Sequence, residues 1–196
     1  MSSSSTVFYP PLLQAYCPTI QTGIFKKALI VLLGSVALAV SAKLALPVGV
    51  IPFTMQTYVV MVLGALLGSR LATASGLLYL AEGLAGLPVF ASGGGWAYLS
   101  SPSFGFLLGF IVAMFFIGWM TERGQGRGLL SSLVIMTLGH AILFAFGVAY
   151  LSASLGLYQA YQVGFAPFIL ASIIKTVMAA LTVAALWRIH AARRAR

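Results

Sequence analysis

Six long apolar runs, separated by short connectors, constrain this chain more than any other feature of its sequence. Most of the runs approach the roughly 20 residues that a helix needs to cross a bilayer. Composition agrees, because 61% of the 196 residues are hydrophobic and only 7% are charged, too few to cover a soluble surface. We therefore expect an all-α integral membrane protein, a bundle of six transmembrane helices. The runs cover residues 25–46, 54–69, 71–87, 104–120, 129–151 and 167–187.

Positive charge is distributed unevenly among the connectors. Nine of the eleven Lys and Arg residues fall on one side of a six-pass topology, whereas the connectors 47–53, 88–103 and 152–166 carry no charge. Because short loops rich in Lys and Arg stay in the cytoplasm, we expect both termini to be cytoplasmic and the uncharged connectors to face outward. The net charge of +9 therefore indicates topology, with the lipid bilayer of the cell membrane rather than nucleic acid as the partner. The nine residues are Lys26, Lys27, Arg70, Arg123, Arg127, Arg188, Arg193, Arg194 and Arg196.

Three segments follow from this topology. Residues 1–24 form a Ser-rich cytoplasmic tail that lacks the pattern of a signal peptide. Two interpretations of this tail stay open: it is unstructured, or Val7, Phe8, Leu12 and Leu13 touch the membrane surface. Residues 25–187 form the six-helix transmembrane domain, and residues 188–196 form a basic cytoplasmic tail. The single cysteine, Cys17, has no partner within the chain for a disulfide.

Two lysines depart from the charge pattern. Lys43 falls at the outer end of the first run, where it either snorkels to the headgroups or serves a site. Lys175 comes eight residues after Pro167, roughly 12 Å along the last helix at 1.5 Å per residue. A lysine at that depth costs about 2.5 to 3.5 kcal/mol unless it faces a polar cavity or a partner. Lys175 is therefore the first candidate for a ligand-binding residue.

Other polar residues fall near these lysines. Ser172 precedes Lys175 by three positions, so both project from one helix face. Glu82 is the only acid outside the cytoplasmic loops, and it either pairs with a lysine or accepts a hydrogen bond from a ligand. Gln56 is too polar to face lipid and is expected to point into the bundle. These side chains suit a ligand with a hydrogen-bonding head and an anionic tail.

The second uncharged connector is unusual for an ordinary loop. Three successive glycines, residues 93–95, precede Trp96 and Tyr98. The aromatic pair either forms part of an interfacial belt or belongs to a lid that the glycines allow to fold over a site. We include both aromatic residues among the candidate binding residues. His140, in the middle of the fifth run, is expected to be a hydrogen-bonded interior histidine.

The sequence argues against covalent chemistry. It contains no phosphate-binding loop, no Cys/His spacing for a metal, and only two acids from which to build a Ser/His/Asp set. We therefore predict no catalytic residues, no metal and no cofactor. Binding or transport is the expected class of function.

Several strings carry a resemblance to a known family. They are Ile-Pro-Phe-Thr-Met-Gln-Thr, Leu-Gly-Ala-Leu-Leu-Gly-Ser-Arg-Leu, Leu-Tyr-Leu-Ala-Glu-Gly-Leu-Ala-Gly-Leu-Pro-Val-Phe-Ala-Ser-Gly-Gly and Ser-Pro-Ser-Phe-Gly-Phe-Leu-Leu-Gly-Phe, in this order. The chain resembles the BioY family, the biotin-binding substrate components of energy-coupling factor transporters. The similarity extends over residues 40–190 and is densest over 47–110. It implies six helices, a biotin pocket near the outer face, a transmembrane coupling protein and a pair of ATPases.

The last run departs from the family pattern at one position. The family carries Pro-Phe-x-Pro-Gly-Asp-x-x-Lys there, and residues 167–175 of this chain match its lysine with Lys175 but place Ser172 at the aspartate. Serine offers biotin's ureido ring only a neutral hydrogen bond, so affinity falls by about 1 to 2 kcal/mol unless another acceptor substitutes. Our hypothesis is that Lys175 holds the biotin carboxylate, while Glu82, Gln56 or Ser172 meets the ring. Two alternatives stay open: capture of another small carboxylate, and a structural membrane subunit without a ligand.

Overall fold

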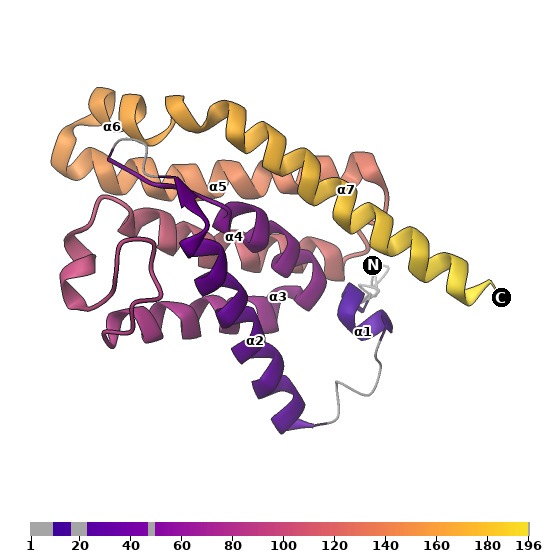
Figure 1. The fold of residues 1–196 in the computed structure, drawn as a ribbon. Coiled ribbons are helices and arrows are strands. Elements are labelled where there is room, and N and C mark those ends of the chain that lie inside the picture. Colours follow the sequence, from indigo (N-terminus) through magenta and orange to yellow (C-terminus); the bar gives the residue numbers. More distant parts are fainter. Residues whose placement is uncertain (1–9, 17–22, 47–49, 196) are drawn as a thin grey trace, which may run out of the picture.

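The structure is a computed structural model that describes residues 10–16, 23–46 and 50–195, and it is almost entirely helical (Figure 1). Val7, Phe8 and Cys17 lie outside these residues. Within the described part of the chain, five helical segments are long and apolar enough to cross a membrane. This confirms the expected helical membrane protein. The elements are α1 (Leu12–Tyr16), α2 (Ile24–Lys43), β1 (Ala45–Leu46), β2 (Phe53–Thr54), α3 (Gln56–Leu84), η2 (Trp96–Ser100), α4 (Phe104–Glu122), α5 (Leu129–Leu155), α6 (Leu157–Gly164), η3 (Ala166–Phe168) and α7 (Ile169–Arg194).

Helix α3 reverses direction at Gly68, where the backbone leaves helical geometry with φ +78° and ψ 174°. The amide Nε2 of Gln56 donates a 2.8 Å hydrogen bond to the hydroxyl of Tyr79, 23 residues along the same element. On a straight helix these residues would be about 35 Å apart at 1.5 Å per residue. The second half of α3 therefore lies beside the first half and runs in the opposite direction (Figure 1). They correspond to the two separate apolar runs expected over 54–69 and 71–87.

Glu122 stabilises this reversal. Its carboxylate accepts hydrogen bonds from the backbone N–H and the hydroxyl of Ser69, both at 2.8 Å, where the second half of α3 begins. A negative charge at a helix N-terminus satisfies free N–H groups and complements the helix dipole. Arg123 directly follows Glu122 in the sequence but does not stabilise the reversal. In the structure, the Arg123 guanidinium instead lies 3.8 Å from the ring centre of Trp119.

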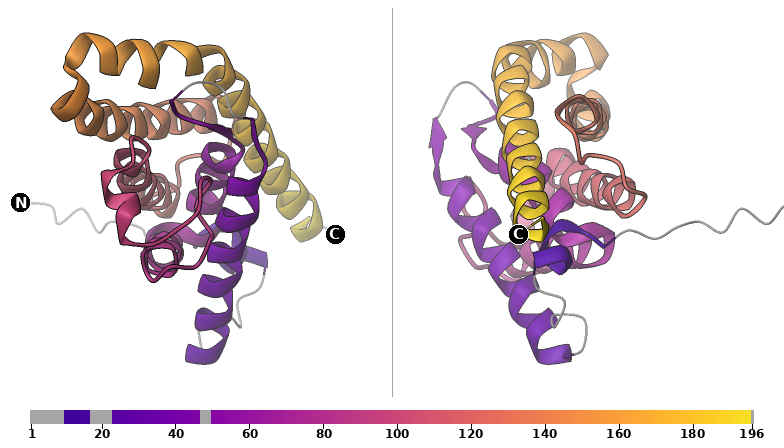
Figure 2. Two further views of the ribbon diagram at one scale, coloured as in Figure 1. Left: turned by 60° about the vertical axis from the view of Figure 1, so that its left-hand side comes forward. Right: turned by 90° about the vertical axis from the view of Figure 1, so that its right-hand side faces the viewer.

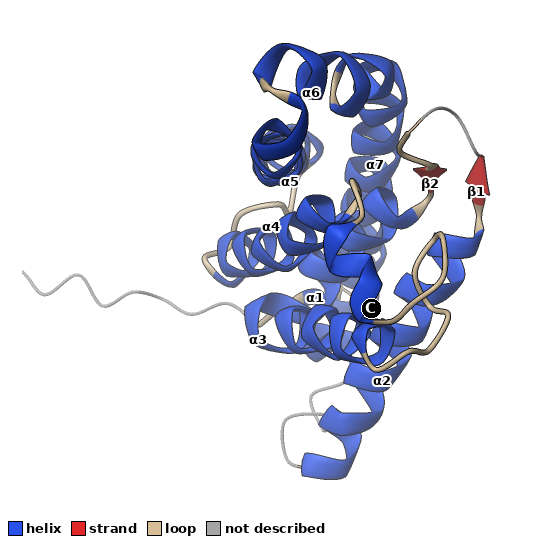
Figure 3. Ribbon diagram, turned by 90° about the vertical axis from the view of Figure 1, so that its left-hand side faces the viewer, coloured by secondary structure: helices blue, strands red, loops and turns tan. Residues whose placement is uncertain are grey.

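The uncharged connectors gather at one end of the bundle, and α1 and the C-terminal end of α7 lie at the other (Figures 1 and 2). Basic residues cluster at the α1 end: Arg193 lies over the ring of Tyr16, and Arg127 lies over the ring of Trp187. At the connector end, β1 and β2 pair in antiparallel register between α2 and α3 (Figure 3). The bundle therefore has one basic end and one end built from uncharged connectors.

Residues 10–16 are ordered against the bundle, unlike either interpretation of the tail. Leu12 is buried, and the Tyr16 hydroxyl donates a 2.8 Å hydrogen bond to the carbonyl of Leu186 in α7. Pro11 lies beside Gly68, at the point where α3 reverses. Leu12 therefore contacts protein rather than the membrane surface, and α1 links the α3 reversal to α7.

Gly118 of α4 provides the closest helix contact at the α3 reversal. A Cβ atom at this position would overlap the backbone of Gly68 and Ser69. We expect Gly118→Ala to destabilise the protein by about 1 to 3 kcal/mol, the usual range for overpacking. The measurement is the apparent Tm in detergent. Gly128→Ala is the control, because no atom lies within 4 Å of its added methyl group, and an equal Tm for both variants would contradict the prediction.

Candidate functional site

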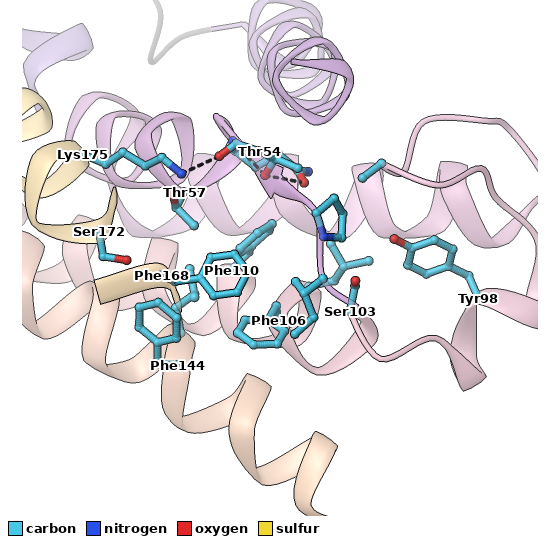
Figure 4. A pocket seen from close by; sticks show the side chains of 16 residues that line it. Thr54, Thr57, Tyr98, Ser103, Phe106, Phe110, Phe144, Phe168, Ser172 and Lys175 are labelled. Atoms are coloured by element: carbon cyan, nitrogen blue, oxygen red, sulfur yellow. Dashed lines mark hydrogen bonds between the residues drawn. The ribbon is translucent and has the colours of Figure 1, made fainter. Parts of the chain in front are cut away.

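A narrow cavity of about 50 Å³ lies at the connector end of the bundle. Its walls come from the β2 region, the start of α3, the second connector, α4, α5 and the start of α7 (Figure 4). Because ligand pockets usually measure about 300 to 1,000 Å³, this cavity must widen to admit a ligand. The residues that line it include Ile51, Pro52, Thr54, Gln56, Thr57, Ala91, Tyr98, Ser103, Phe106, Leu107, Phe110, Leu143, Phe144, Phe168, Ser172 and Lys175.

The cavity has polar side chains at both ends and mainly aromatic side chains between them. Lys175, Thr57 and Ser172 lie at one end, and Ser103 and Tyr98 lie at the other (Figure 4). Between them are four phenyl rings, of Phe106, Phe110, Phe144 and Phe168. This arrangement suits an elongated ligand that carries a polar group at each end.

Lys175 projects from the second turn of α7 toward the junction of β2 and α3. Its Nζ donates a 2.6 Å hydrogen bond to the backbone carbonyl of Thr54 (Figure 4). A lysine ammonium has three N–H donors, so two stay available for a ligand. Lys175 faces the cavity, as its depth in the last helix had suggested.

Gln56 lies in the cavity wall and is only 3% exposed. Its Nε2 bonds to Tyr79, and its Oε1 accepts a 3.4 Å hydrogen bond from the Thr54 hydroxyl. The Thr54 hydroxyl also accepts a hydrogen bond from the N–H of Gln56 at 3.3 Å. Gln56 therefore points into the bundle as expected, where it joins the two halves of α3.

The second connector forms one wall of the cavity and is fixed by side chains from three helices. Lys43 of α2 donates a 2.7 Å hydrogen bond to the carbonyl of Phe90, and Tyr79 of α3 donates one of 3.2 Å to the carbonyl of Val89. Tyr150 of α5 donates to the carbonyl of Leu99. The connector is thus anchored along its length.

The two candidate aromatics of this connector occupy different places. Tyr98 is buried and lines the cavity, and burial raises the pKa of its hydroxyl, which therefore stays protonated. Trp96 is 72% exposed and does not line the cavity. Lys43 does not line it either, because its amino group is held at the carbonyl of Phe90.

Glu82 also lies away from the cavity, on the face of α3 that packs against α2. Its carboxylate accepts a hydrogen bond from the hydroxyl of Ser35. Its carboxylate makes no described contact with Lys43 or Lys175, whose amino groups donate to the backbone carbonyls of Phe90 and Thr54. The pairing of Glu82 with a lysine was therefore wrong.

Sequence reasoning missed Thr57 and the phenyl rings as cavity residues. The Oγ1 of Thr57 is buried and has no hydrogen-bond partner among the described residues. Its position one residue after Gln56, at the start of an apolar run, was the available signal. Phe106 and Phe110 share one face of α4 by their four-residue spacing, but an apolar helix gives no sign of which face meets a cavity.

The fold and the cavity define a multi-pass helical membrane protein with a narrow cavity of polar and aromatic side chains at one end. Over the described residues, no group of three His, Cys, Asp or Glu side chains is placed to hold a metal ion. Residues 14–192 match the BioY family, and the chain belongs to that family.

Its relatives include curated proteins from several organisms. The "Probable biotin transporter BioY" of Lysinibacillus sphaericus is 34% identical over 80% of this chain and 84% of its own length. The "Biotin transporter BioY" of Rhizobium etli is 39% identical over 74% of this chain and 83% of its own length. A crystal structure of the S-component for biotin from an ECF-type ABC transporter covers 84% of this chain and 92% of its own, with a TM-score of 0.74 and 24% identity. That structure shows the likeness in fold.

The anchoring of the second connector is testable through Tyr150. We expect Tyr150→Phe to speed hydrogen exchange at residues 96–101 roughly fivefold, because one neutral hydrogen bond contributes about 1 kcal/mol. Hydrogen–deuterium exchange with mass spectrometry gives the readout. Tyr158→Phe is the matched control, since Tyr158 is 76% exposed. Unchanged exchange in Tyr150→Phe would show that other contacts hold the connector.

Proposed function

We propose that this protein captures biotin at its outward-facing end for uptake across the cytoplasmic membrane. The observation that carries the proposal is the cavity with Lys175 at one polar end, hydroxyl groups at the other and phenyl rings between. Biotin has a matching shape, with a carboxylate at one end, a ureido ring at the other and an apolar body. The function of the relatives, biotin transport in several organisms, supports the same ligand.

In the proposed complex, Lys175 holds the carboxylate and keeps its bond to Thr54. The Ser172 and Thr57 hydroxyls lie at the same end and donate to the second carboxylate oxygen. The ureido ring then lies toward Tyr98 and Ser103, whose hydroxyls each donate and accept hydrogen bonds. Gln56 acts as a positioning residue in the wall. Glu82 has no part in this complex, because Ser35 and the α2 interface hold it outside the cavity.

We further propose six membrane crossings, with both termini in the cytoplasm. The reversal at Gly68 supports two crossings within α3, and the basic cluster at the α1 end agrees with the positive-inside rule. A transmembrane coupling protein and an ATPase pair are the proposed partners, since the chain matches a family of substrate components. Purification from native membranes tests this assembly: a co-purifying ATPase pair supports coupled transport, and a protein that takes up biotin alone refutes the requirement.

The role of Lys175 is tested by binding in detergent. We expect Lys175→Ala to weaken biotin binding by roughly 10- to 100-fold, because a hydrogen bond to a charged group contributes about 1.5 to 3 kcal/mol. Biotin methyl ester lacks the anion, so Lys175→Ala should weaken its binding only slightly. Lys26→Ala, at the basic end of the bundle, is the control.

The outcome separates the proposed function from its alternatives. If Lys175→Ala loses the same affinity for biotin and for its methyl ester, Lys175 acts on the fold rather than on the anion. If the parent protein binds no biotin, a panel of other small carboxylates tests the runner-up function. Failure of the whole panel would favour a structural subunit.

A further inference from the structure

A second hollow of about 330 Å³ adjoins the cavity between α5 and α7. Ser172 and Phe144 line both spaces, so they form the shared wall. The lining of this groove is otherwise mostly apolar, including Phe165, Ile169 and Ile173. Its one imidazole belongs to His140, which is 5% exposed. The groove therefore continues the Ser172 end of the cavity, the end where the proposed function places the carboxylate.

His140 has one satisfied and one unsatisfied ring nitrogen. Its Nδ1 lies 2.9 Å from the hydroxyl oxygen of Thr176 in α7. Its Nε2 is buried without a hydrogen-bond partner in the described part of the chain. The sequence had suggested a hydrogen-bonded interior histidine, and this holds for one nitrogen only. A buried polar atom without a partner costs roughly 1 to 3 kcal/mol, so this atom points to a missing partner.

Thr176 differs from other helical threonines in a way that allows its hydroxyl to donate to His140. Four helical threonines donate their hydroxyl hydrogen to the carbonyl four residues earlier: Thr73, Thr121, Thr137 and Thr182. Thr176 makes no such bond and instead meets His140. Its hydrogen is thus free to be donated to Nδ1. In a neutral imidazole this leaves the ring hydrogen on Nε2, which is then a donor.

We infer that His140 is a further substrate-binding residue, whose Nε2–H donates to the ligand carboxylate across the wall at Ser172. This inference rests on the proposed function and deepens it. Lys175, Thr57, Ser172 and His140 are then able to donate hydrogen bonds at this end, and no acid lies among the residues that line either space. A cluster of donors without an acid suits a carboxylate and disfavours a neutral group that has only one acceptor.

The test measures the affinities of the parent protein and of His140→Phe for biotin and for biotin methyl ester in detergent. We expect biotin affinity to fall roughly tenfold while the affinity for the ester is unchanged, so the preference for the acid shrinks by the same factor. Phenylalanine keeps a planar ring but has no N–H. The control is His190→Phe, because His190 lies against Tyr16 at the other end of the molecule and should leave both affinities unchanged.

Thr176→Val separates binding from packing, because it removes the bond to Nδ1 but keeps the imidazole. If His140 serves only to join α5 to α7, Thr176→Val and His140→Phe should weaken both ligands to the same extent, which would overturn the inference. Unchanged biotin binding in His140→Phe would also overturn it while leaving the proposed function intact. If the parent protein binds no biotin, the proposed function fails and the inference falls with it.

Discussion

The reversal of α3 at Gly68 decides where the residues of the cavity lie. It returns the chain toward the end from which α3 began, so that Tyr79 meets Gln56 and the second connector emerges beside the first. A carboxylate at the start of the second half and a glycine in α4 make this close turn possible. Without the reversal, Tyr98 and Gln56 would belong to opposite ends of the bundle. The cavity therefore depends first on the path of the helices, which brings its side chains to the same end of the bundle.

The two acids of the chain are both engaged outside the cavity. Glu122 caps the second half of α3, and Glu82 accepts a hydrogen bond from Ser35 at the α2 interface. In a low-dielectric interior, either arrangement satisfies a group whose isolated burial is costly. This leaves the ammonium of Lys175 with only a backbone carbonyl as its described partner. The cavity thus keeps a positive charge that is available to an anionic ligand.

The sequence predicted helices well and side-chain partners less well, for a physical reason. Apolar runs and charged ends follow from the length and dielectric of the bilayer, which act on every residue alike. The rotation of each helix depends instead on local packing, and the apolar composition hides it. The depth of Lys175 was enough to place it at the cavity, whereas Glu82 and Lys43 were near the right end but on helix faces directed elsewhere. His140 and Thr57 required coordinates, because only an inventory of hydrogen bonds shows which of their atoms lacks a partner.

Serine at position 172 has opposite effects on the two ends of a ligand. A carboxylate there would offer a strong acceptor to a ureido ring, but it would also neutralise the nearby ammonium and repel a ligand anion. With Ser172, the side chains near Lys175 can all donate hydrogen bonds and include no acid, which favours a ligand anion at this end over a ureido ring. Lys175 has enough N–H groups to bind the carboxylate and the Thr54 carbonyl together.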